Sequence, residues 1–266
     1  MWKKLRIASF DIGKKNFAHY VEDCDLNDLN DLSVLHRAIP YEKVRDKWLK
    51  SSATMEILMN ALMMNGTRID IGVFNFQTGD AAKSTKLDNP TLLNFFNHME
   101  RYRPLWDTCD IFVIEQQFVA LHGRYRGINM DAIKLGAITH AWLLEQYPNR
   151  EVVSFGSTNK TQMLGASSRM NKAARKKWAT AKALSIFEQR NDTEALRMYQ
   201  LSLDIKGKRL NTEEKIQSYF VSFEDCAKDI KRMAEYMLRT RQKMDDISDT
   251  VVQLQAYKYT RFVNNS

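Results

Sequence analysis

The segment most informative about the architecture is Ile7-Ala8-Ser9-Phe10-Asp11-Ile12-Gly13-Lys14-Lys15-Asn16-Phe17-Ala18-His19-Tyr20. Its pattern predicts a strand, a tight turn and a second strand. Asp11 closes a short apolar run, Gly13 supplies a turn where a positive φ costs nothing, and the alternation resumes at Phe17. A carboxylate at the end of a rigid strand suits a metal ligand or a general base. Taken alone, however, an Asp before a glycine turn is more often only part of the turn.

Two further acidic positions occur in comparable settings. Residues 110–115 hold a continuous apolar run of buried-strand length that ends in Glu115. Asp245, Asp246 and Asp249 open or interrupt the final helix, where residues three and four apart lie on one face. Carboxylates this close repel one another, and a divalent cation removes the repulsion. The alternative is an exposed acidic helix end, since acids favour helix N-termini.

The composition bounds the class of protein. At 266 residues, with 44% hydrophobic and 27% charged residues, we expect one globular domain, because the chain has no internal repeat and no low-complexity linker. No apolar stretch of about 18 residues is present, and the N-terminus leaves no room for a signal peptide, so we expect neither a membrane span nor secretion. Three scattered cysteines favour a reducing, intracellular compartment over a disulfide scaffold or zinc site.

The periodicities predict a hairpin, a strand, a helix, a strand, a helix, a strand, a basic segment and a helix. Residues 22–35, rich in Asp and Asn, predict a surface loop, and residues 41–64 carry helical spacing. The third strand is expected at 68–77 and a helix from Pro90. A second helix at 128–146 and a short strand at 151–155 follow.

A basic segment spans residues 156–177. Its Lys and Arg residues, among almost no acids, are Lys160, Arg169, Lys172, Arg175, Lys176 and Lys177. A solvated basic loop is the plainer interpretation, because charge runs are usually that. The functional interpretation is contact with a phosphate backbone, with which the formal net charge of +8 is compatible.

Together these motifs resemble the RuvC-like Holliday junction resolvases of the RNase H-like superfamily, especially the poxvirus and mitochondrial branch. Four motifs carry the resemblance: Phe10-Asp11-Ile12-Gly13-x-Lys15-Asn16, Val113-Ile114-Glu115-Gln116-Gln117-Phe118, Ile133-Lys134-Leu135-Gly136 and Asp246-x-x-Asp249. The resemblance implies an α/β fold with a mixed central sheet, its first three strands antiparallel and its later strands parallel, flanked by helices. Residues 22–66 and 189–225 have no counterpart in the short bacterial enzymes and would be insertions in a single domain of residues 1–266.

The resemblance also implies an activity. The chain would be a Mg²⁺-dependent endonuclease, with Mn²⁺ as the alternative and two ions per active site, that resolves four-way DNA junctions. Two symmetric nicks require two active sites, so a homodimer is implied. An infected-cell cytoplasm or an organelle would suit such an enzyme. The implied metal-binding and catalytic carboxylates are Asp11, Glu115, Asp246 and Asp249. Lys160 would orient the attacking water or stabilise phosphorane charge, with Lys176 and Lys177 as second candidates.

The DNA-binding residues expected on the same grounds are Lys14, Lys15, Phe118, Arg124, Arg126, Lys172, Arg175, Lys176 and Lys177. Phe118 resembles the aromatic that separates base pairs at a junction; core packing is the alternative. At about 100° per residue, helical phase favours Asp245 as the partner of Asp249, whereas the family spacing favours Asp246. We take Asp246, and assign Asp245 to the helix start or to a supporting role behind the ligands.

Three other functions remain as alternatives. A nuclease of the same fold acting on another branched DNA or an RNA–DNA hybrid has the same four acids. An actin- or sugar-kinase-type ATPase also begins with an Asp-x-Gly hairpin. It needs further glycine-rich loops, and this chain has ten glycines and no second such turn. A non-catalytic DNA-binding protein of this fold is disfavoured by the presence of all the acids.

Overall fold

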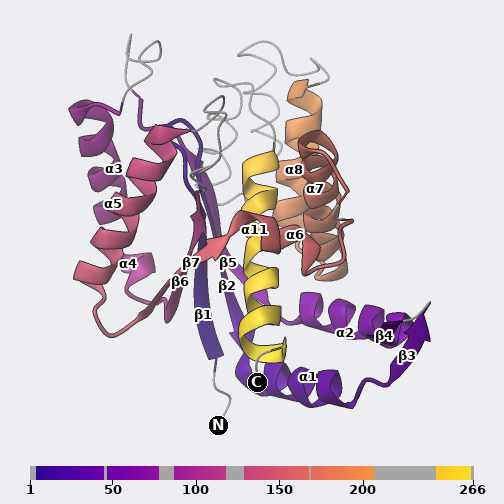
Figure 1. The fold of residues 1–266 in the computed structure, drawn as a ribbon. Helices are drawn as coiled ribbons and strands as arrows, with labels where there is room; N and C mark the ends of the chain where they lie inside the picture. The colour runs from indigo at the N-terminus through magenta and orange to yellow at the C-terminus, as the bar shows by residue number, and fades with distance from the viewer. Residues whose placement is uncertain are drawn as a thin grey trace, which may run out of the picture.

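A mixed five-stranded sheet forms the centre of the molecule (Figure 1). Its strands are β1 (Lys4–Asp11), β2 (Phe17–Asp25), β5 (Thr67–Phe74), β6 (Ile111–Gln116) and β7 (Glu151–Gly156), in the order β5-β2-β1-β6-β7. The first three strands of the sheet pair antiparallel, and β6 and β7 join in parallel. This is the RNase H-like arrangement, so the predicted fold class is confirmed. The computed structural model describes residues 4–44, 47–77, 87–117, 129–167, 169–206 and 244–264.

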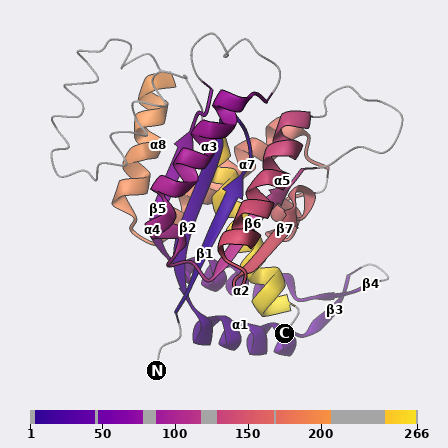
Figure 2. The same ribbon diagram turned by 90° about the vertical axis from the view of Figure 1, so that its left-hand side faces the viewer.

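One face of the sheet is covered by α3 (Asn89–Arg101), α4 (Arg103–Trp106) and α5 (Met130–Gln146) (Figure 2). The helix expected from Pro90 therefore breaks at its end, and the helix expected at 128–146 is present. Successive side chains of β1 point to opposite faces of the sheet. Phe10 packs in the aromatic core beneath α3 and α5, whereas Ile7 packs on the opposite face.

The other face carries α11 (Asp245–Lys258), which runs along the sheet with α6 (Ser157–Gln162), α7 (Lys172–Gln189) and α8 (Thr193–Lys206) beside it (Figure 1). Ile247 and every later residue of α11 except Asp249 are buried, because the helix lies between the sheet and α7. A π-helical turn at Tyr259–Asn264 continues the chain. None of the helices in the described ranges is long and apolar enough to cross a membrane.

The segment between β2 and β5 differs from the prediction. Residues 22–35 do not form a loop: β2 runs to Asp25, whose side chain caps α1 (Leu26–Ala38) by accepting from the backbone N–H of residue 27. Leu29 and Leu32 are buried at helical spacing, and this burial outweighs the turn preference of the surrounding Asp and Asn residues.

Residues 41–64 are not one helix either. They begin with a small hairpin of β3 (Tyr41–Val44) and β4 (Lys47–Lys50), and only α2 (Ser52–Met64) is helical. The helical spacing that predicted the longer helix holds for Leu58 and Leu62, which are buried in α2.

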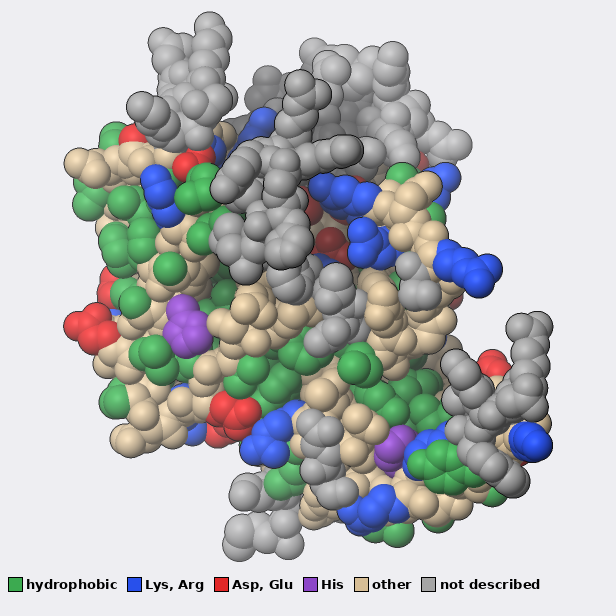
Figure 3. Space-filling model, in the orientation of Figure 1, with side chains coloured by type: hydrophobic (Ala, Val, Ile, Leu, Met, Phe, Trp, Pro, Cys, Tyr) green, Lys and Arg blue, Asp and Glu red, His purple; other side chains and the backbone are tan. Residues whose placement is uncertain are grey.

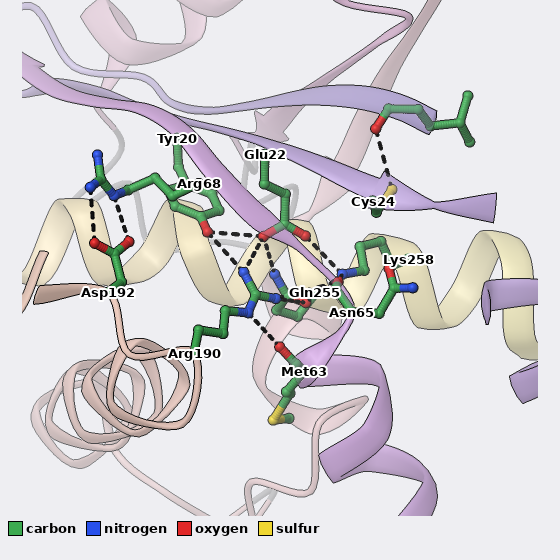
Figure 4. A network of polar contacts seen from close by, with 11 residues as sticks. Tyr20, Glu22, Cys24, Met63, Asn65, Arg68, Arg190, Asp192, Gln255 and Lys258 are labelled. Atoms are coloured by element: carbon green, nitrogen blue, oxygen red, sulfur yellow. Dashed lines mark hydrogen bonds and ion pairs between the residues drawn. The ribbon is translucent and has the colours of Figure 1, made fainter. Parts of the chain in front are cut away.

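A buried network of charged and polar groups fastens the C-terminal half of α11 (Figure 4). Glu22 of β2 lies 2.7 Å from Lys258 Nζ through one carboxylate oxygen and 2.7 Å from an Arg190 guanidinium nitrogen through the other. Tyr20 and Gln255 donate to the same carboxylate, at 2.9 and 3.0 Å. Because Glu22 and Lys258 are fully buried, these contacts must satisfy the charges that water would otherwise solvate.

Candidate active site

Three carboxylates and one lysine meet at the carboxyl edge of the parallel strands. Asp11 ends β1 and Glu115 lies near the end of β6, and because these strands pair in parallel as far as Phe10, their ends lie side by side. The Lys160 ammonium lies 2.9 Å from Glu115 Oε1 and 3.5 Å from Asp249 Oδ1. The sheet, α6 and the first turns of α11 thus bring together residues that are far apart in the sequence.

Lys160 is held as a cation within this cluster. Its side chain is only 8% exposed, and burial alone would lower its pKa. The negative charges of Glu115, Asp249 and Asp11 outweigh burial and raise the pKa above its usual value. A lysine in this state cannot act as a general base at neutral pH, but it can stabilise developing negative charge.

The three carboxylates titrate differently. Burial, and then the charge of Glu115, raise the pKa of Asp11 well above its usual value. Burial would also raise the pKa of Glu115, but Lys160 and a hydrogen bond with Asp11 lower it. The side chains of Asp11 and Glu115 share a hydrogen bond, which raises the pKa of Asp11 and lowers that of Glu115. The pKa of Asp249 is raised by burial and by Glu115, against the opposing effect of Lys160.

Asp245 and Asp246 lie in the first turn of α11 beside a second lysine. Lys176 of α7 places its Nζ 3.3 Å from Asp245 Oδ2 and 3.9 Å from Asp246 Oδ1. Burial raises the pKa of Asp246 to about 6 although Lys176 opposes it, and its carboxyl group contacts the Asn16 side chain in the β1–β2 turn. Asp246 thus faces the turn that follows Asp11, while Asp245 begins the helix and is bound by Lys176. The choice of Asp246 over Asp245 as the ligand stays a prediction.

The expected DNA-binding residues are distributed around the site. Lys14 lies 2.6 Å from the carboxylate of Asp131 at the start of α5, so its ammonium is already engaged by an acid. Lys15 is exposed in the turn, as are Lys172 and Lys177 on α7. Arg175 is half-buried on α7. Three of the expected DNA-binding residues lie outside the described ranges: Phe118, Arg124 and Arg126. Figure 3 shows Lys and Arg side chains beside recessed acidic side chains over the start of α11.

The donor chemistry of the cluster suits a hard divalent cation, because Mg²⁺ and Mn²⁺ prefer carboxylate oxygens. Within the described part of the chain, no three His, Cys, Asp or Glu side chains are placed to hold one ion together. The Lys160 ammonium lies between Glu115 and Asp249 instead. The oxygen ligands of these residues are therefore of the type that a divalent ion prefers. To bind there, the ion would have to replace the Lys160 ammonium as the partner of Glu115 and Asp249.

Sequence reasoning missed two features of this site. One is the contact of Lys176 with Asp245 and Asp246, because spacing along the chain gives no distance between α7 and α11. The other is Gln253, which bonds to both strands of the site. Its signal in the sequence is its position four residues after Asp249, which puts both side chains on one face of the final helix.

Comparison with known proteins identifies viral relatives. The chain is 32% identical over 206 residues to uncharacterized protein 97L of Invertebrate iridescent virus 3, which covers 70% of this chain and 87% of that protein. It is 27% identical over 281 residues to uncharacterized protein 170L of Invertebrate iridescent virus 6, covering 96% and 89% of the two chains. No protein-family model matches the chain.

Solved structures similar to the chain include three resolvases. The fowlpox virus resolvase in complex with Holliday junction DNA has a TM-score of 0.39 at 12% identity, covering 96% of this chain and 98% of that one. The RuvC of Thermus thermophilus has a TM-score of 0.34 at 10% identity, covering 97% and 96%. The yeast mitochondrial Holliday junction resolvase has a TM-score of 0.34 at 14% identity, covering 99% and 85%.

The order and directions of the strands are those of the RNase H-like fold that the motifs predicted. The chain has this fold, and it belongs to the same family as protein 97L of Invertebrate iridescent virus 3.

Proposed function

We propose that the chain is a metal-dependent endonuclease that cleaves branched DNA, with four-way junctions as its substrate. The observation that carries the proposal is the meeting of Asp11, Glu115 and Asp249 around Lys160 at the carboxyl edge of two parallel strands. Asp246 stands one turn away on the same helix. Such a set of acids beside a permanent cation is suited to hydrolysing a phosphodiester.

The side chains would divide the work as follows. Asp11, Glu115, Asp246 and Asp249 would hold one or two Mg²⁺ or Mn²⁺ ions, which supply an activated water and stabilise the leaving oxygen when bound. Lys160 would then place its positive charge against the phosphorane oxygens, since the surrounding acids keep it protonated.

The basic face of α7 would hold the DNA. Lys172 and Lys177 are exposed there, and Lys176 reaches from the same helix to the acids. A phosphate backbone laid along this helix would enter the site beside Asp246. Four-way junctions as substrate, and a homodimer that makes two nicks, follow from the motif resemblance. The viral relatives favour action within an infected cell.

The test compares substrates under one set of conditions. Labelled four-way junction, flap, linear duplex and RNA–DNA hybrid are incubated with the protein and Mg²⁺, Mn²⁺ or excess EDTA, and the cuts are mapped on every strand. We expect paired, symmetric nicks in the junction with either ion and none in EDTA. Cutting in EDTA contradicts metal dependence, and cutting of the hybrid alone assigns a different nuclease. ATP hydrolysis without any DNA cleavage contradicts the nuclease assignment.

A further inference from the structure

Gln253 is a buried glutamine in the middle of α11 that touches both strands of the candidate site. It lies four residues after Asp249, so the two side chains share one face of the helix, one turn apart. Its side chain is only 1% exposed. Its Nε2 donates to Ser9 Oγ at 3.1 Å, to the Phe10 carbonyl at 3.1 Å and to the Val113 carbonyl at 3.3 Å.

The acceptors lie where the two strands stop pairing. The parallel ladder between β1 and β6 ends at the rung formed by Phe10 and Ile114, and the next residues are Asp11 and Glu115. A single amide group therefore bridges both strands at their last two rungs and connects them to α11.

The two ends of the Gln253 amide differ in their contacts. Within the described residues, Oε1 of Gln253 is buried and has no hydrogen-bond partner. A buried polar atom without a partner is unfavourable, and an apolar side chain of the same length would avoid that penalty. The donors of Gln253, by contrast, are all directed at the two strands. A positioning role accounts for both facts, because it needs only the donors.

We propose that Gln253 is a positioning residue for the proposed nuclease reaction, setting the separation between the carboxylates of α11 and those at the ends of β1 and β6. This inference rests on the proposed function. Metal ligands must be held to a fraction of an ångström, and groups that orient them are as consequential as the ligands themselves. Gln253 would do this without touching metal or substrate.

The same helix supplies a matched control. Gln255 is also a fully buried glutamine, two residues further on, and faces away from the site. It donates to Glu22 at 3.0 Å and accepts from Lys258 at 2.9 Å, in the network of Figure 4. Replacing either glutamine by methionine removes a buried amide of the same size from the same helix. Only the change at Gln253 removes a contact with the strands that carry Asp11 and Glu115.

The experiment measures Mn²⁺ binding without DNA, by electron paramagnetic resonance, together with thermal unfolding and the single-turnover cleavage rate at saturating junction. We expect Gln253→Met to weaken Mn²⁺ binding about 10- to 100-fold and to lower the cleavage rate, with junction affinity in Ca²⁺ unchanged. We expect Gln255→Met to lower the melting temperature and to leave Mn²⁺ affinity as in the wild type.

Wild-type Mn²⁺ affinity in Gln253→Met would overturn the inference, as would an equal loss in both variants, which would mean general loosening of α11. If Gln253→Met does not fold, Ser9→Ala removes one acceptor and should give a smaller loss of Mn²⁺ affinity; no loss overturns the inference. A wild-type protein that neither binds Mn²⁺ nor cuts branched DNA contradicts the proposed function itself. A wild type that does both, beside an unaffected Gln253→Met, contradicts only the role of Gln253.

Discussion

Lys160 lies where the acids of three different elements meet. Its ammonium contacts Glu115 and Asp249, and their charges keep it protonated at neutral pH. Lys160→Gln should therefore lower the single-turnover cleavage rate about 10²- to 10³-fold, the usual effect of removing one group that stabilises transition-state charge. Junction affinity should not change, and Mn²⁺ should bind at least as tightly, because the ammonium no longer competes for the two carboxylates. Lys4→Gln, at the end of β1 far from Asp11, is the control, and a normal rate in Lys160→Gln would remove Lys160 from the chemistry.

Two adjacent acids at the start of α11 have different surroundings. Asp246 contacts Asn16 in the β1–β2 turn and lies 3.9 Å from Lys176 Nζ, whereas Asp245 lies closer to the same ammonium, at 3.3 Å. Asp246→Asn should abolish cleavage at every Mg²⁺ concentration with little change in melting temperature, and Asp245→Asn should retain substantial activity. Metal-titrated cleavage and thermal unfolding of both variants decide the matter. The reverse result would show that Asp245 is the ligand.

At the scale of elements, the buried network around Glu22 makes the anchoring of α11 depend on pH. Burial alone would raise the pKa of Glu22, but Arg190 and Lys258 lower it to about 2. A carboxylate with a lowered folded-state pKa stabilises the fold above its unfolded value near 4.5, and this stability is lost as the pH falls towards 2. The shift corresponds to about 3 kcal/mol.

Glu22→Gln should therefore lower the free energy of unfolding at pH 7 and flatten its dependence on pH between about 5 and 2. Urea unfolding at several pH values measures both quantities. The control is Glu145→Gln, which changes an exposed glutamate of α5 and should leave the curve as in the wild type. An unchanged slope in Glu22→Gln would mean that the network does not hold this carboxylate ionised.

The lysines of the basic helix α7 differ in their surroundings. Lys172 and Lys177 are exposed, while Lys176 is bound to acids of α11. Replacing Lys172 and Lys177 together by Ala should weaken binding to every DNA and reduce the slope of log affinity against log salt by about 2. Binding measured across a salt series checks this, with Lys4→Ala at the far end of β1 as the control. An unchanged slope would place the phosphate contacts elsewhere.

Strands whose apolar residues form a clear run or alternation in the sequence could be predicted. The apolar run before Glu115 and the alternation around Gly13 specify strands whatever packs on them. Helix α1 was not predictable, because Asp25, Asp28 and the neighbouring asparagines suggest turns. The helix forms because Leu29 and Leu32 are buried in the core shared with α11 and α2. Local composition cannot report a partner that lies 200 residues away in sequence.

In the molecule as a whole, the central sheet brings together residues that are far apart in the sequence. Strand order places the ends of β1 and β6 together, so the pairing of Asp11 with Glu115 could be predicted once the fold was recognised. The insertion of Lys160 between Glu115 and Asp249, and the bridge made by Gln253, depend on how α6 and α11 dock. Those docking positions are set by tertiary packing, so they cannot be predicted from the spacing of residues along the chain.

We propose that Asp11, Glu115 and Asp249 form a metal-dependent phosphodiesterase site rather than a structural cluster. The decisive measurement is the cleavage of a labelled four-way junction by the wild type, Asp11→Asn and Glu115→Gln in Mg²⁺, with junction binding measured in parallel in Ca²⁺. We expect paired nicks by the wild type and none by either variant, while both variants bind the junction normally because phosphate contacts supply the affinity. Nicking by Glu115→Gln at the wild-type rate would contradict the assignment of these acids to a phosphodiesterase site.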